Sequence, residues 1–127
     1  MLGYLSPEEV LAIHSELIDR YGGSHGIRDL SLLESAVARP RAGFGEFEAY
    51  PTIWAKAAVL AHSIIRNHPF IDGNKRTGVT SAILFIERND YLIESTEREL
   101  VALALGIAAK EFDETAIAEW LERHSQL

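Results

Sequence analysis

Apolar residues recur at three- and four-residue spacings along most of this chain, which is the pattern of helices with one buried face. The clearest start signal is Ser6, a good N-cap, followed by Pro7 at the first helical position and by Glu9, which completes a capping box. We predict a helix from there to about Arg20, ended by Gly22. Its predicted buried face consists of Val10, Ile13, His14, Leu17 and Tyr21.

Further helices are predicted up to residue 88. The second follows Asp29 or Ser31 and stops before Pro40, because the residue before a proline avoids helical geometry. Thr52 caps a third that reaches about residue 67, and a fourth covers about 74–88. The fourth is apolar nearly all round, as expected of a central helix surrounded by others. Buried positions are predicted at Leu32, Leu33, Ala36 and Val37 in the second helix and at Ile53, Ala57, Leu60, Ala61 and Ile64 in the third.

The remaining segments are short. Residues 41–51 carry glycine and proline turn signals, so we predict a mobile loop or a short hairpin there. Residues 91–93 read as an extended connector too short for a sheet of its own. Thr96 caps a fifth helix and Asp113 a sixth. The sequence therefore predicts an all-α bundle of six helices, with a central apolar helix and a short flap loop, in a single domain covering residues 1–127.

Composition narrows the class of protein. No stretch reaches the roughly 18 apolar residues of a membrane span, and the N-terminus lacks the regions of a signal peptide, so we expect a cytoplasmic protein without a membrane partner. The absence of cysteine excludes disulfides, thiolate zinc sites and cysteine nucleophiles. A net charge of −7 disfavours direct nucleic-acid binding through many Lys and Arg contacts. Proteins and a nucleotide are the expected partners.

The residue types that phosphate chemistry requires are concentrated in residues 68–77, His-Pro-Phe-Ile-Asp-Gly-Asn-Lys-Arg-Thr. An imidazole such as that of His68 can accept a hydroxyl proton at neutral pH. A carboxylate such as Asp72 can hold Mg²⁺ whose other ligands are water and substrate phosphates. Each residue also has a simpler explanation, His68 as a helix-terminal histidine and Asp72 as a helix N-cap, and capping would leave one carboxylate oxygen free for metal.

A helix that begins at about Asn74 would strengthen this site. Gly73 lets the backbone approach a ligand, and the free N–H groups and positive dipole end of the helix would face the phosphates. Without a ligand, Asn74 is a second cap candidate, and Lys75 and Arg76 are solvated cations that oppose the helix dipole. Two cations at a helix start favour an anion nearby.

The order and spacing of these residues resemble the signature of the Fic/Doc family. Its Fic branch reads His-Pro-Phe-x-Asp/Glu-Gly-Asn-Gly-Arg, and its Doc (death on curing) branch has Lys after the Asn, as at Lys75 here. Doc proteins also have similar short sequence segments at the positions of residues 6–9, 20–23 and 33–40. The resemblance to the Doc branch therefore covers nearly the whole chain, and it implies a helical bundle of the Fic/Doc type.

The resemblance implies a role for each residue of the motif. His68 would be the general base that deprotonates a hydroxyl of a target protein, and Asp72 would bind Mg²⁺. Asn74 would help the backbone N–H groups of Gly73 and Lys75 to hold phosphate. The implied cofactors are ATP, or another nucleoside triphosphate, and Mg²⁺. The implied catalytic residues are His68, Asp72, Lys75 and Arg76, and the implied nucleotide-binding residues are Gly73, Asn74, Lys75 and Arg76.

Departures from the Fic pattern bear on which group is transferred. Fic enzymes that transfer AMP carry a second Arg where this chain has Val79, and they have Gly in place of Lys75. In the Doc branch these differences accompany transfer of the γ-phosphoryl group of ATP, which implies a protein kinase of unusual fold. Gly73, where a Doc motif often has Ala, is shared with the Fic branch. AMP transfer is therefore the alternative.

The resemblance also implies partners. Self-restrained Fic proteins carry Ser/Thr-x-x-x-Glu-Gly/Asn, and the nearest match here, residues 115–119, is followed by Trp120, so restraint is expected from another chain. Doc toxins are neutralised by an antitoxin whose disordered tail folds on the toxin, and their target is a translation elongation factor. Phe44, Phe47 and Tyr50 of the flap loop either help to dock that target or have a core role.

Two other functions stay open. Helical ribonuclease toxins place an Arg and a His on one helix, and Arg20 and His25 match by letters, although Gly22 and Gly23 would break that helix. The second is a nucleotide-binding module without catalysis that acts only through its antitoxin complex. The sequence alone leaves the target, the preferred nucleotide and the oligomeric state undetermined.

Overall fold

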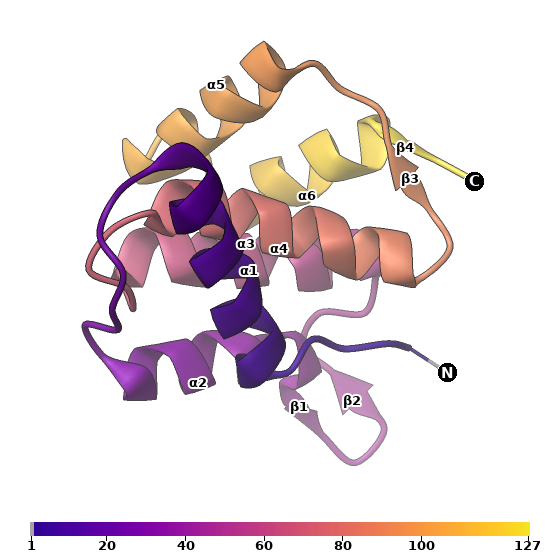
Figure 1. Cartoon of the computed structure of the whole chain (residues 1–127). Helices are drawn as coiled ribbons and strands as arrows, with labels where there is room; N and C mark the ends of the chain where they lie inside the picture. Colours follow the sequence, from indigo (N-terminus) through magenta and orange to yellow (C-terminus); the bar gives the residue numbers. More distant parts are fainter. Residues whose placement is uncertain (1) are drawn as a thin grey trace.

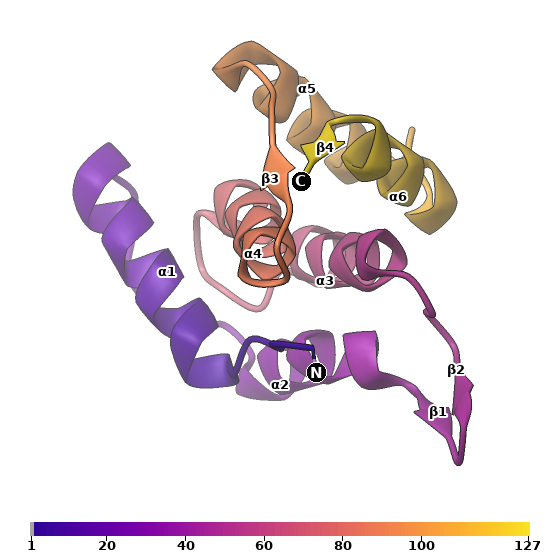
Figure 2. The same cartoon turned by 90° about the vertical axis from the view of Figure 1, so that its right-hand side faces the viewer.

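The computed structural model describes residues 2–127, and over this range it contains six α-helices and two small antiparallel strand pairs, which confirms the predicted all-α bundle. The helices are α1 (Pro7–Tyr21), α2 (Leu30–Ala38), α3 (Ile53–Asn67), α4 (Asn74–Arg88), α5 (Glu97–Ala108) and α6 (Glu114–Arg123), with a 3-10 turn η1 (Arg39–Arg41) after α2. Helices α3 and α4 lie side by side in the middle; α1 and α5 pack on α4, and α2 and α6 pack on α3 (Figures 1 and 2). No helix within residues 2–127 is long and apolar enough to cross a membrane.

Five of the six described helices, all except α4, begin at side-chain caps predicted from the sequence. Ser6 and Thr96 form complete capping boxes at the starts of α1 and α5. The side chains of Asp29, Thr52 and Asp113 each accept a hydrogen bond from a backbone N–H in the first turn of α2, α3 and α6. Each cap satisfies an N–H group that would otherwise have no partner, so these starts are encoded locally.

Helix α3 is the most enclosed helix of the bundle. Its residues 56–61 and 63–65 are all buried, whereas α4 leaves Leu84 40% exposed. The central position predicted for α4 is therefore shared with α3. The two helices approach closely at Gly78, where a Cβ atom would lie 2.7 Å from the Ile65 side chain and 3.1 Å from the Ala61 carbonyl oxygen. Only glycine fits this crossing without displacing α3.

The buried face of α1 is narrower than predicted. Val10, His14 and Ile18 are buried, while Leu17 is only partly covered and Tyr21 is 53% exposed. The prediction that Tyr21 is buried is wrong. Its helix packs mainly on α4, so a stripe at four-residue spacing suffices, and Leu17 and Tyr21 are left to line a pocket.

The flap segment forms a short hairpin, which was one of the two predicted outcomes. Its tip exposes two phenylalanines, Phe44 at 80% and Phe47 at 59%. Tyr50 differs, because it is half-buried and its hydroxyl oxygen accepts a hydrogen bond of 2.6 Å from Arg39. The paired strands are β1 (Gly43–Phe44) and β2 (Phe47–Glu48).

A buried lysine holds the base of this hairpin. Lys56 of α3 is 1% exposed, and its Nζ donates hydrogen bonds to the Pro40 carbonyl oxygen at 3.0 Å and to Glu48 Oε1 at 2.9 Å. A buried ammonium requires such partners. The sequence pattern missed Lys56, since nothing local distinguishes it from a surface lysine.

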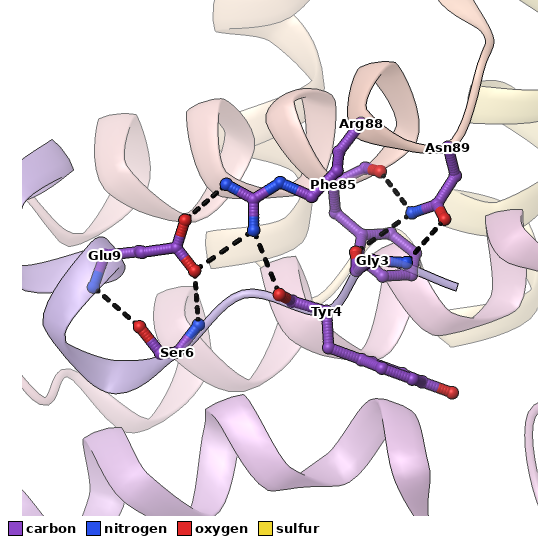
Figure 3. A network of polar contacts seen from close by, with 7 residues as sticks. All are labelled: Gly3, Tyr4, Ser6, Glu9, Phe85, Arg88 and Asn89. Atoms are coloured by element: carbon purple, nitrogen blue, oxygen red, sulfur yellow. Dashed lines mark hydrogen bonds and ion pairs between the residues drawn. The ribbon is translucent and has the colours of Figure 1, made fainter. Parts of the chain in front are cut away.

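The two ends of the chain also pair with internal segments. The connector after α4 was not expected to form a sheet of its own, and it pairs instead with the C-terminal residues, as β3 (Leu92–Ile93) with β4 (Ser125–Gln126). Near the N-terminus, Asn89 bonds to the backbone of Gly3, and Arg88 bonds to Glu9 (Figure 3). These contacts hold residues 3–9 against the end of α4.

Candidate active site

The sequence motif forms the loop between α3 and α4 and the first turn of α4. His68 ends α3 in the left-handed conformation, with φ 52° and ψ 61°, and Gly73 precedes α4 with φ 78° and ψ 17°. The left-handed region costs a non-glycine residue about 1–2 kcal/mol, whereas Gly73 adopts it freely. Two left-handed residues thus bound the loop, and the first of them is the exposed His68.

The segment before α2 holds one side of this loop. Arg28 donates from Nη2 to the Asn67 carbonyl oxygen and from Nε to the His68 carbonyl oxygen, both at 2.6 Å. The backbone N–H of Arg28 donates to the Pro69 carbonyl oxygen at 2.7 Å. Ile27 also forms an antiparallel bridge with Phe70.

His14 of α1 packs against the loop and forms a hydrogen bond with it. It is 4% exposed, its Nε2 lies 2.8 Å from the Asp72 carbonyl oxygen, and its ring stacks on Phe70 at 3.9 Å with an angle of 4°. Because a carbonyl oxygen only accepts, Nε2 must carry the proton. His14 therefore donates a hydrogen bond to the backbone of Asp72 and helps to hold the loop in place.

Asn74 binds the loop to the start of α4. Its Oδ1 accepts from the Phe70 N–H at 3.0 Å and its Nδ2 donates to the Phe70 carbonyl oxygen at 2.9 Å, in a side chain that is 7% exposed. Nδ2 also lies 3.5 Å from His68 Nδ1, which is too long for a strong hydrogen bond. Since its side chain bonds to the loop, the backbone N–H is the group of Asn74 that is left for a ligand.

The carboxylate of Asp72 is exposed and held by two backbone groups. Oδ1 accepts from the Gly73 N–H at 2.9 Å, and Oδ2 accepts from the Ser24 N–H at 3.1 Å. Gly73 is the N-cap of α4 and no side chain caps this helix, so the alternative interpretation of Asp72 as the N-cap is wrong. The carboxylate therefore accepts no hydrogen bond from the first-turn N–H groups of α4.

The start of α4 is consequently open to an anion. Within residues 2–127, the N–H groups of Asn74, Lys75 and Arg76 have no hydrogen-bond acceptor. These groups carry the positive end of the helix dipole, and the exposed side chains of Lys75 and Arg76 add two charges. The Arg76 guanidinium lies 4.4 Å from the centre of the Tyr21 ring, which supports it by a cation–π contact.

A pocket of about 400 Å³ lies beside this helix start, between α1, α4 and α5. Asp72, Gly73, Lys75 and Arg76 line one part, and the rest is mostly apolar. His68 does not line the pocket and lies at the start of the adjoining loop. An apolar pocket with a few charged groups suits a ligand with an anionic part and an organic body. The apolar lining includes Leu17, Val79, Ile83, Leu100, Val101, Ala104 and Leu105.

Residues 4–86, about two thirds of the chain, match the family model described as Fic/DOC family. The chain belongs to the Fic/Doc family. It is 45% identical to Toxin Doc of Mycolicibacterium smegmatis over 89 residues, which are 70% of this chain and 66% of that protein. It is 34% identical to Protein kinase doc of Escherichia phage P1 over 120 residues, which are 94% of each chain. Both names agree with the resemblance to the Doc branch.

The donor set of this Fic/Doc site is compatible with Mg²⁺. Each Asp72 oxygen accepts one backbone N–H, which leaves further lone pairs on two hard oxygen donors. Among residues 2–127 there is no group of three or more His, Cys, Asp or Glu side chains that could hold a metal ion. An ion at Asp72 would therefore take its other ligands from water and phosphate, as Mg²⁺ commonly does.

The structure brings together most, but not all, of the residues selected from the sequence of this Fic/Doc protein. Asp72, Gly73, Lys75 and Arg76 share one pocket, whereas the side chain of Asn74 is buried in the loop. Sequence reasoning missed the residues that hold the site, because their contacts join positions that are 40 to 58 residues apart in the chain and leave no local signal. They are His14, Tyr21, Ser24 and Arg28.

Proposed function

We propose that this chain is a Doc-like toxin of a toxin–antitoxin system that transfers the γ-phosphoryl group of ATP to a hydroxyl of a target protein. The observation that carries the proposal is the start of α4, where free N–H groups, two cations and a carboxylate meet at one pocket. The exposed imidazole of His68 is on the adjoining loop. The names of the relatives, Toxin Doc and Protein kinase doc, support both parts of the proposal.

In the proposed reaction, His68 takes the proton of the target hydroxyl as its oxygen forms a bond to the γ-phosphorus. The bond from that phosphorus to the β,γ-bridging oxygen breaks, ADP leaves, and His68 later returns its proton to solvent. The N–H groups at the start of α4, with Lys75 and Arg76, hold the phosphates and offset their charge. Mg²⁺ held by Asp72 would neutralise further phosphate charge.

The proposal favours γ-phosphoryl transfer over AMP transfer. Val79, where AMP-transferring Fic enzymes have a second Arg, is 6% exposed and lines the pocket, so that turn of α4 supplies no cation. Lys75 is exposed beside the phosphate-binding backbone, where Fic enzymes have Gly. The nucleotide would therefore be held differently from the way it lies in a Fic enzyme, and AMP transfer is the alternative outcome of the test.

We also infer the partners. An antitoxin tail that folds over the pocket would cover the exposed apolar side chains of Val101 and Leu105 on α5, which are 50% and 53% exposed. The target would be a translation elongation factor in the cytoplasm. The flap hairpin precedes α3 and His68 follows it, so the 15 residues of α3 separate them by roughly 20 Å. Phe44 and Phe47 would touch the target far from the modified hydroxyl.

Paired labelling tests the proposed chemistry. The purified chain is mixed with a cell extract and with ATP labelled on the α- or the γ-phosphorus, in parallel with a chain carrying His68→Ala. Label from the γ-position on a protein band, absent with the variant, is the expected result. Label from the α-position would mean AMP transfer. No label from either position would contradict both transfer reactions, and a non-catalytic nucleotide-binding module or a ribonuclease would be the remaining functions.

A further inference from the structure

Arg28 is the one side chain among residues 2–127 that hydrogen-bonds to the carbonyl oxygens of both Asn67 and His68. We propose that Arg28 is a positioning residue for His68, an inference that rests on the proposed role of His68 as the base. Arg28 would act by fixing the backbone from which the imidazole projects. Nothing in the sequence motif of residues 68–77 points to it, because it lies 40 positions before His68.

The contact geometry explains why an arginine suits this place. The last carbonyl groups of a helix have no partner within the helix, and α3 ends in a left-handed turn that exposes two of them side by side. The planar guanidinium donates Nε–H to His68 and Nη2–H to Asn67, each at 2.6 Å. A cation at this end also complements the negative end of the α3 dipole. A lysine ammonium would carry the charge but lack the fixed fork.

His68 needs such support because its backbone is strained. A non-glycine residue stays in the left-handed region only where its surroundings determine it. The nearest polar contact of the His68 ring is Asn74 Nδ2 at 3.5 Å, which is too long to fix the ring by itself. The backbone conformation, and with it Arg28, therefore decides where the imidazole lies.

Arg28 is separate from the phosphate-binding groups. It does not line the pocket at the start of α4, and its guanidinium contacts backbone carbonyls, not Asp72, Lys75 or Arg76. Loss of Arg28 should therefore lower the rate of transfer without weakening nucleotide binding. A general loss of structure would change both.

The test compares Arg28→Ala and Arg28→Lys with Arg123→Ala, which removes the same charge from the exposed surface of α6. We expect Arg28→Ala to lower kcat for γ-phosphoryl transfer by about 10–100-fold with the KM for ATP within about twofold of wild type, since small misplacements of a reacting group cost this much. Arg28→Lys should recover only part of the rate. Millimolar guanidinium added to Arg28→Ala should restore some of it, and Arg123→Ala should match wild type.

NMR of a protein with labelled histidines gives a second readout that needs no activity. The backbone and imidazole signals of His68 should shift in Arg28→Ala, while those of His62 and His124, which lie on α3 and at the end of α6, should not. Unchanged His68 signals, or kcat equal to wild type, would overturn the positioning role of Arg28. A wild-type chain that transfers no phosphoryl group would overturn the proposed function instead, and the NMR comparison would then decide the role of Arg28 alone.

Discussion

A Cβ atom at Gly23 would lie 2.7 Å from Oδ2 of Asp72. The N–H of the next residue, Ser24, donates a hydrogen bond to the same oxygen at 3.1 Å. The glycine turn after α1 therefore contacts the Asp72 carboxylate and helps to hold it, although 48 positions separate Ser24 from Asp72. Gly23 has a φ of 115°, so its lack of a side chain serves both the turn and the close approach.

Substituting the two glycines of this turn separates these effects. Gly22 and Gly23 both have positive φ, at 91° and 115°, but a Cβ at Gly22 would meet nothing within 4 Å. Both Gly22→Ala and Gly23→Ala should lower stability by about 1–2 kcal/mol. Gly23→Ala alone should displace Asp72 and raise the Mg²⁺ concentration for half-maximal transfer about tenfold or more. Equal Mg²⁺ dependence of the two variants in a titration would show that the contact of the Gly23 turn with Asp72 does not affect Mg²⁺ binding.

Lys75→Gly tests the choice between the two transfer chemistries. Removing its charge and bulk should weaken γ-phosphoryl transfer about 10-fold or more, because a hydrogen bond to a charged group contributes about 1.5–3 kcal/mol. It should not create an efficient AMP transferase, since Val79 still supplies no second cation. The measurement is the rate of α- and γ-label transfer by both proteins. An unsubstituted chain that moves the α-label would contradict the kinase assignment.

The ion pair between Glu9 and Arg88 predicts a pH dependence of stability. The hydrogen bond from Arg88, followed by that from the Ser6 N–H, lowers the pKa of Glu9 from 4.5 to about 2. A lowered carboxylate pKa stabilises the fold above the unfolded pKa, and this contribution is lost as the pH falls from about 4.5 towards 2. Both side chains are about 40% exposed, so solvent screening limits the gain to about 1 kcal/mol or less.

Urea unfolding of Glu9→Gln and wild type at several pH values measures this contribution. Glutamine retains the oxygen that caps Ser6 but has no charge for Arg88. Wild type should be the more stable protein above pH 4.5, and the difference should shrink towards pH 2. A difference that is constant over this range would mean that the pair does not titrate as inferred.

Expression in cells tests the proposed toxicity. The chain alone should arrest growth, and the His68→Ala form should be harmless. Co-expression of the proposed antitoxin, sought as a small protein encoded by the adjacent reading frame, should restore growth. A tail that folds on binding can cover a long surface, so hydrogen exchange should slow in α4 near Lys75 and in α5 near Leu105. Protection found only elsewhere would mean that restraint does not come from covering the pocket.

The starts of the helices could be predicted from the sequence because their signals are local. Five side chains each cap the N–H group three residues ahead: Ser6, Asp29, Thr52, Thr96 and Asp113. The start of α4 was predicted from the motif and begins at Asn74, as expected. The pairing of β3 with β4 was not predicted, because two-residue strands have no periodicity to recognise.

The candidate site could be located from the sequence but its supports could not. Short spacing put Asp72, Lys75 and Arg76 at one helix start, and the structure has them at one pocket. The side chain of Asn74 points into the loop because it forms two hydrogen bonds with the backbone of Phe70. The sequence gives no sign of these bonds. Arg28 is an exposed arginine in a loop, and only the fold brings it to the end of α3.

The rate of γ-label transfer by His68→Ala measures whether His68 is the general base of the proposed reaction. His68 is exposed and its side chain makes no short hydrogen bond within the described chain, so the substitution should leave Tm nearly unchanged and ATP binding intact. Transfer should fall about 10²–10⁴-fold, the usual contribution of a general base. Transfer by His68→Ala at the wild-type rate would contradict this role of His68.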